Sequence, residues 1–146
     1  MKKILSLLLV LSLLPMVIAE DVGQGGSGTV GTDFSVIFNP TSLDFGNIVA
    51  GSSASLLNEI IGTNSHLEID GISVTPDDAE GIFNNDNVLF SMTDSDFVTG
   101  DVFTTPAIEI PVLGTVDFYV QMNVPSGTST GPFSGTITYT IMEYMP

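Results

Sequence analysis

Alternation of apolar and polar residues is the clearest pattern in the second half of the chain. Every second residue is apolar from Val116 to Val124, and Ile137 to Ile141 repeats this pattern between threonines. A period of two predicts half-buried antiparallel β-strands. The segment 125–135 between them (PSGTSTGPFSG) is dense in turn residues, so we expect these two strands to form a hairpin with a long connection.

The first half predicts more short strands. Alternation runs through residues 67–74, but its phase slips by one residue at Gly71, which is typical of a β-bulge or a tight turn. Another strand covers residues 33–39 and stops at Pro40. Shorter candidates span residues 48–50, 54–61, 88–92, 97–103 and 107–112. Seven to nine short strands between residue 33 and the end of the chain predict an all-β fold, a single immunoglobulin-like antiparallel β-sandwich.

The N-terminus has the layout of a secretory signal peptide. Lys2 and Lys3 precede an apolar stretch that ends in small residues at Ala19, which predicts a signal peptide over residues 1–19. A retained membrane anchor is the alternative, but the stretch is shorter than the ~20 residues of a spanning helix. Residues 20–32 contain five glycines and predict a flexible leader, so the sandwich domain is expected over residues 33–146.

Charge excludes several classes of partner. The 146 residues carry 17 acidic and two basic side chains, one histidine and no cysteine, a net charge of -15. Nucleic acids and anionic membranes attract basic proteins, so neither is an expected partner. A chain without cysteine forms no disulfide and no thiolate metal site. Because Lys2 and Lys3 lie in the predicted signal peptide, residues 20–146 carry 17 carboxylates and no lysine or arginine. We therefore expect salt and divalent cations to influence assembly.

Three stretches carry a resemblance to a known family. Residues 38–55 (FNPTSLDFGNIVAGSSAS), 67–74 (LEIDGISV) and 131–141 (GPFSGTITYTI) resemble the opening, middle and closing strands of Hydin-type (ASH) immunoglobulin-like domains. The resemblance spans residues 34–142. It implies a sandwich of seven or eight strands used in assembly and protein contact. It implies no catalysis, and no catalytic residue carries over.

One sequence motif suggests hydrolysis at first sight. Gly127 to Gly131 matches the G-x-S-x-G pattern of a nucleophile elbow, which requires a strand-to-helix turn and a histidine later in the chain. Here the motif lies between two predicted strands and the single histidine, His66, precedes it. A turn is the better interpretation, His66 is expected in an exposed loop, and we predict that the protein is not an enzyme.

Clustered carboxylates are the remaining candidate for chemistry. Asp94, Asp96 and Asp101 lie close in the sequence and supply oxygen ligands of the kind that calcium selects. Their spacing does not match an EF-hand loop, and solvated turns are the alternative. No cofactor is predicted, and calcium is the only candidate metal ion.

These observations predict a secreted protein located outside the cell or at its surface. Its function is expected to be that of a structural subunit of a filament, pilus or matrix fibre, with self-association into a homopolymer or association with other surface proteins. Strand donation from the N-terminal segment would link subunits, and the apolar face of Phe34, Val36 and Phe38 is the better donor than the glycine-rich leader. The alternative is a secreted, non-catalytic module that binds a glycan or a protein partner, with or without calcium.

Overall fold

The computed structural model describes residues 20–23, 28–30 and 34–145. Strands dominate this part of the chain, with one helical turn, α2 (Gly100–Phe103). The strands in chain order are β1 (Glu20–Gly23), β2 (Gly28–Val30), β3 (Phe34–Asn39), β4 (Ser53–Gly62), β5 (Leu67–Pro76), β6 (Val88–Ser91), β7 (Ile108–Ile110), β8 (Thr115–Asn123) and β9 (Gly135–Glu143). The predicted signal peptide, residues 1–19, lies outside the described residues and stays a prediction.

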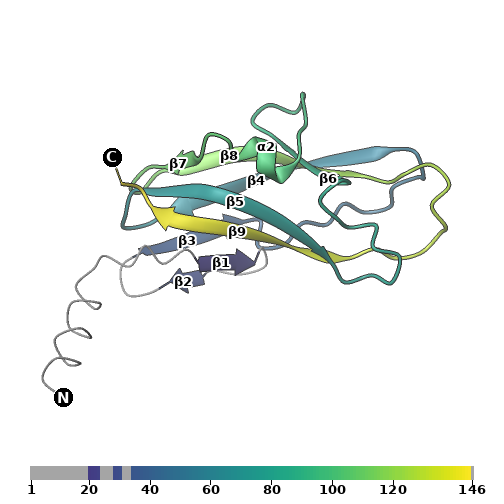
Figure 1. Ribbon diagram of the computed structural model, residues 1–146, viewed down its shortest axis with the longest axis horizontal. Coiled ribbons are helices and arrows are strands. Elements are labelled where there is room, and N and C mark those ends of the chain that lie inside the picture. The colour runs from purple at the N-terminus through teal and green to yellow at the C-terminus, as the bar shows by residue number, and fades with distance from the viewer. Residues whose placement is uncertain (1–19, 24–27, 31–33, 146) are drawn as a thin grey trace, which may run out of the picture.

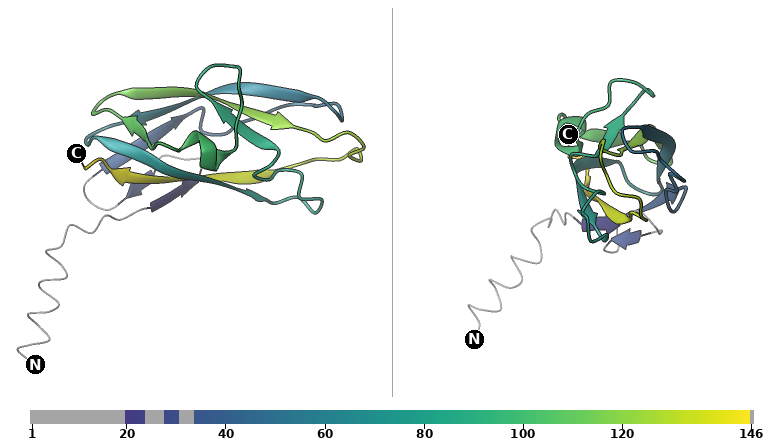
Figure 2. Two further views of the ribbon diagram at one scale, coloured as in Figure 1. Left: turned by 45° about the horizontal axis from the view of Figure 1, so that its top comes forward. Right: turned by 90° about the vertical axis from the view of Figure 1, so that its right-hand side faces the viewer.

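These strands form two antiparallel sheets that pack face to face (Figures 1 and 2). One sheet has the order β1-β9-β5-β7 and the other has the order β2-β3-β4-β8-β6. Residues of opposite parity face the core and the solvent along each long strand, as a period of two requires. The predicted all-β sandwich is confirmed.

The pairing of β8 and β9 differs from the prediction. We expected these strands to form a hairpin, but β8 pairs with β4 and β6, whereas β9 pairs with β1 and β5. Their connection therefore crosses from one sheet to the other. Both strands have a strongly apolar inner face, and burying these two faces against each other requires opposite sheets.

The phase slip at Gly71 is a β-bulge within one continuous strand. The register of β5 against β9 shifts between Ile69 and Gly71, so the apolar residues before and after the shift all face the core. The sequence predicted either a β-bulge or a tight turn at Gly71, and the bulge is confirmed. The bulge keeps Ile72 and Val74 buried, at 5% and 6% exposure, instead of turning them to solvent.

Two other predicted strands are wrong. Residues 97–103 contain only an isolated bridge from Val98 to Phe90, followed by α2. The turn α2 packs so tightly on β5 that a Cβ atom at Gly100 would lie 2.9 Å from the carbonyl oxygen of Ile72. Residues 48–50 form no strand either, since segment 43–49 has no regular structure.

The segment predicted as a flexible leader, residues 20–32, contains two short strands. β1 pairs with β9 and β2 pairs with β3, each through a ladder of backbone groups. Sheet edges offer unpaired N–H and C=O groups that any backbone except proline can satisfy, so pairing there does not need apolar side chains. Residues 24–27 and 31–33 lie outside the described residues.

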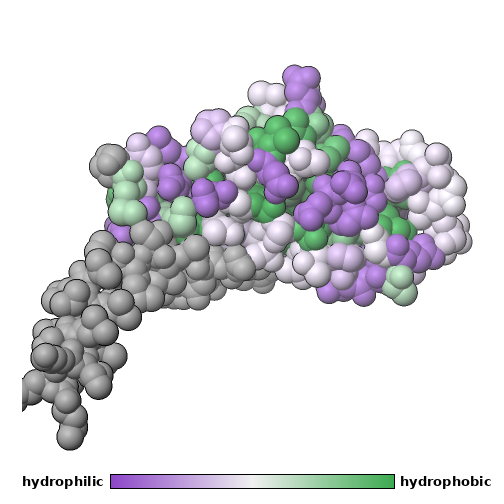
Figure 3. Space-filling model, viewed as in Figure 1, coloured by the Kyte–Doolittle hydropathy of each residue, from purple (hydrophilic) through white to green (hydrophobic). Residues whose placement is uncertain are grey.

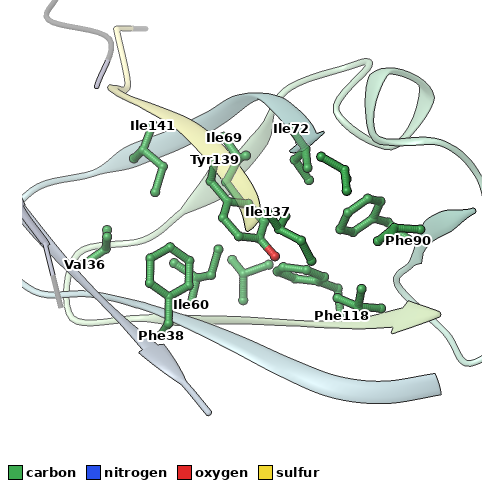
Figure 4. Packing of buried hydrophobic residues seen from close by; sticks show 14 of the residues in the cluster. Val36, Phe38, Ile60, Ile69, Ile72, Phe90, Phe118, Ile137, Tyr139 and Ile141 are labelled. Atoms are coloured by element: carbon green, nitrogen blue, oxygen red, sulfur yellow. The ribbon is translucent and has the colours of Figure 1, made fainter. Parts of the chain in front are cut away.

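A chain of aromatic rings runs through the core between the sheets (Figure 4). Tyr139 of β9 lies between Phe38 of β3 and Phe118 of β8, with ring centroids 5.1 and 6.1 Å away. Phe118 continues the chain to Phe90 and Phe103. Burial raises the pKa of Tyr139, whose hydroxyl lies 3.5 Å from the side-chain nitrogen of the buried Asn58.

Phe118→Ala is expected to lower the free energy of unfolding by about 3–5 kcal/mol, because it removes a fully buried ring that contacts three other aromatic rings. Tyr119→Ala, on the outer face of the same strand, should cost much less. Urea unfolding followed by circular dichroism measures both. Equal losses for the two variants would contradict this arrangement of the core.

Candidate functional site

The strands β1 and β2 each form one edge of a sheet, and β7 and β6 form the opposite edges. β1 lies at the edge beside β9, and β2 lies at the edge beside β3. Each is held by one short ladder, Glu20–Gly23 against Thr138–Ile141 and Gly28–Val30 against Phe34–Val36. The N-terminal segment thus reaches both sheets on the same side of the sandwich, seen in purple in Figure 1.

The predicted donor strand lies inside the sandwich of its own chain. β3 pairs with the end of β4, from Asn39 opposite Glu59 to Val36 opposite Gly62. Val36 and Phe38 are each only 1% exposed and belong to the core, as Figure 4 shows. Phe34 begins β3, and its side chain lies outside the described part of the chain. Donation of this strand would therefore remove two core side chains from the donor.

A groove of about 850 Å³ opens at one end of the sandwich. It lies between segment 42–50 and the connection from β8 to β9. It exists because β3 ends at Asn39, so segment 43–49 passes the first half of β4 without forming a strand ladder. Three separate parts of the chain contribute its apolar lining, which consists mainly of Leu43, Phe45, Ile48, Phe83, Phe133 and Ile137.

The wall of this groove around Phe83 is held by a carboxylate and a glycine. Asp78 accepts hydrogen bonds from the backbone N–H groups of Ile82 and Phe83, at 3.0 and 3.4 Å. Partial desolvation acts to raise the pKa of Asp78, but the backbone hydrogen bonds outweigh it and hold that pKa below its ordinary value. The Phe83 ring lies against Gly135, where a Cβ atom would lie 2.1 Å from it.

The three aspartates predicted as calcium ligands do not form a group. Asp94 accepts a hydrogen bond from the Ser55 hydroxyl at 2.7 Å, Asp96 has a positive φ of 52°, and Asp101 is in the first turn of α2. Among the residues that the structure describes, no set of three or more carboxylate or histidine side chains is placed to hold a metal ion. Calcium binding stays a prediction without an assembled site.

The G-x-S-x-G serine and the histidine lie at opposite ends of β9. Ser129, in the loop before β9, donates a hydrogen bond to Glu80 at 2.6 Å. His66 lies beside the last residues of β9, where its ring stacks on Tyr144 and its Nε2 is 3.3 Å from Glu109. The structure therefore does not bring the two together. His66 lies in the loop before β5, as expected, and its side chain is 39% exposed.

Carboxylates of two strands face each other directly on the outer faces of the sheets. Glu59 is opposite Asp117 in the β4–β8 ladder, and Glu68 is opposite Glu109 in the β5–β7 ladder. Like charges in this position destabilise a strand pair. Hydrophilic and hydrophobic residues are interspersed over the face of the molecule drawn in Figure 3. Acidic groups thus lie close together within residues 20–146, which contain no lysine or arginine to neutralise them.

No family model matches the chain, and neither a curated protein nor a solved structure does. The resemblance to Hydin-type domains therefore stays a prediction. The described residues also include no helix that is long and apolar enough to cross a membrane.

Asp117→Asn is expected to raise the free energy of unfolding by about 0.2–1 kcal/mol, since it removes one of two facing carboxylates. The gain should shrink as salt concentration rises, because ions screen the repulsion. Asp70→Asn is the control: it removes the same charge at the bulge, where the register places no residue opposite. Urea midpoints across a salt series measure both, and equal gains would rule out the cross-strand effect.

Acid is expected to weaken the turn that carries Phe83. Because the pKa of Asp78 is lower in the folded protein, its contribution to stability is complete above the pKa of the unfolded chain. That contribution is lost as pH falls through the folded pKa. The stability difference between the protein and Asp78→Asn should therefore be larger at neutral pH than in acid. A difference that stays constant from neutral pH to about pH 3 would contradict this role.

Proposed function

We propose that this protein is an extracellular structural subunit of a surface filament, pilus or matrix fibre, in which N-terminal strands link one subunit to the next. The observation that carries this proposal is the position of β1 and β2, the first strands of the described chain, at the outer edges of the two sheets. A terminal edge strand is exchanged between copies at little cost, because the ladder that it forms with a neighbour is the same as the ladder within its own chain.

The short ladders favour β1 and β2 over β3 as the exchanged elements. β1 and β2 each have a single strand partner among the described strands, whereas β3 lies between β2 and β4 and fills the core with Val36 and Phe38. Exchange of β1 and β2 needs only backbone pairing. The donor segment of the proposal is therefore residues 20–30. The strand that carries Phe34, Val36 and Phe38 stays in the sandwich of its own chain.

The charge of the chain supports linkage through backbone groups. With 17 carboxylates and no lysine or arginine in residues 20–146, copies of the chain have no ion pairs of that kind to hold them together. Strand addition uses N–H and C=O groups, which carry no net charge. Solvent cations would screen the remaining repulsion between subunits.

The alternative function is a secreted module that binds a glycan or a protein partner. The groove between segment 42–50 and the β8–β9 connection favours it, since Phe45, Phe83 and Phe133 supply apolar rings in a concave site. A protein that stays monomeric under all salt conditions and binds such a ligand in this groove would support this alternative instead.

The variant Asp21→Pro/Val22→Pro is expected to abolish polymers that residues 20–146 form. Neighbouring residues of a strand point their N–H groups to opposite sides, so two consecutive prolines remove at least one donor from the ladder with β9. Asp21→Ser/Val22→Thr is the matched control and keeps every N–H group. Sedimentation velocity and negative-stain imaging measure the outcome. Polymers that survive the proline variant would exclude strand exchange through β1.

A further inference from the structure

The turn between β7 and β8 presents two neighbouring aliphatic side chains to solvent. Pro111 to Gly114 form a four-residue turn that is closed by a hydrogen bond from the Gly114 N–H to the Pro111 carbonyl at 2.9 Å. Val112 is 53% exposed and Leu113 is 80% exposed. We call these two residues the apolar tip. Isolated exposed apolar residues are common on proteins, but here two of them are adjacent in one hydrogen-bonded turn.

The backbone of the apolar tip is strained as well as exposed. Leu113 has a φ of 54°, in the left-handed region that glycine and asparagine usually occupy at turns. Leu113 lies outside the core, and a leucine adopts this backbone conformation only at a cost in free energy. Leu113 is therefore unfavourable for the stability of the isolated subunit. Its presence at the surface points to a contact with another molecule.

The apolar tip and the groove lie at opposite ends of the sandwich. The tip closely precedes Thr115, the first residue of β8, and Val124, which lines the groove, directly follows the last residue of β8. Figure 1 shows β8 running along the molecule between these two ends. A contact between one copy's tip and another copy's groove joins two different surfaces, so a head-to-tail arrangement of copies is heterologous and extends into a filament where its rotation does not close into a ring.

Charge singles out the same two surfaces. Residues 111–114 carry no charge, and Asp44 is the single charged residue among those that line the groove, with Asp78 and Glu80 hydrogen-bonded behind its wall. Elsewhere carboxylates face each other across strands, so two copies approaching through those surfaces repel each other. The tip and the groove lining are therefore surfaces with few charges, through which two acidic copies can approach each other.

We propose that the groove binds the apolar tip of a second copy, so that Val112 and Leu113 pack against Phe45, Phe83 and Phe133 in a head-to-tail contact. This inference rests on the proposed function as a self-assembling subunit and adds a second contact to it. Strand exchange would supply the backbone link between neighbours. The tip would set the direction in which the next subunit is added.

The absence of cysteine allows a direct test by cross-linking. A Leu113→Cys copy mixed with a Val49→Cys copy, whose side chain borders the groove and is 74% exposed, should give a covalent heterodimer with a short bis-maleimide. A copy carrying both substitutions should give a ladder. Val102→Cys, 57% exposed on α2, replaces Leu113→Cys in the matched control and should give background dimer only. Yields equal to this control would overturn the proposal.

Leu113→Asn provides an independent measurement in a variant that is expected to fold. Asparagine suits the left-handed backbone, so the melting temperature should stay the same or rise. Association should fall by roughly ten- to a hundredfold, the effect of losing one buried leucine. The control Val102→Asn should leave association unchanged. Unchanged association of Leu113→Asn would exclude the tip as a contact.

The two proposals fail in different ways. If the proline variant Asp21→Pro/Val22→Pro loses its polymers, but the Leu113→Cys and Val49→Cys copies give no specific cross-link, the head-to-tail contact is excluded and strand exchange stands. Specific cross-links together with polymers that resist the proline variant would exclude strand exchange through β1, and the head-to-tail contact would stand. A groove that captures a glycan or another protein and excludes the tip would overturn the contact between copies.

Discussion

The packing of β8 against β9 across the sandwich determines the rest of this structure. Phe118 and Tyr139 lie on facing sheets, and the aromatic chain that connects Phe38 to Phe90 passes through them. Because these consecutive strands belong to different sheets, their connection must cross the end of the sandwich. That crossing, together with the early end of β3, leaves the groove beside Phe83 and Phe133. The same contact that builds the core therefore also leaves one end incompletely covered.

The one-sided charge of the chain limits how carboxylates can be accommodated. They are held by neutral donors, as Asp78 is held by backbone N–H groups, Asp94 by the hydroxyl of Ser55 and Glu80 by that of Ser129. Such arrangements satisfy each carboxylate locally but leave its charge uncompensated. In the proposed assembly, attraction between copies would then come from backbone pairing or from apolar surfaces. Sheet edges and the two ends of the sandwich offer them, and the exposed side chains of Ile37 and Leu57 add apolar surface on β3 and β4.

Local features of the fold could be predicted from the sequence, whereas the pairing of the strands could not. Alternation in residues 116–124 and 137–141 located β8 and β9, and the phase slip located the bulge at Gly71, because side-chain parity is a property of consecutive residues. The hairpin assigned to β8 and β9 was wrong because the choice of partner strand depends on residues far away in the chain. The groove was missed for the same reason: Leu43, Phe83 and Phe133 meet only after folding. The turn at Val112 was missed as well, because the sequence predicted a strand over residues 107–112, whereas β7 ends at Ile110.

The contact between Asn58 and Tyr139 has a consequence for how the two sheets align. Asn58 belongs to β4 in one sheet and Tyr139 to β9 in the other, and both side chains are fully buried. Apolar faces tolerate sliding, because methyl groups and rings find new neighbours after a small shift. A buried amide and hydroxyl do not, since displacement by one residue would separate their polar atoms inside the core. The surrounding aliphatic residues would accept several alignments of the two sheets. The Asn58–Tyr139 pair favours one of them.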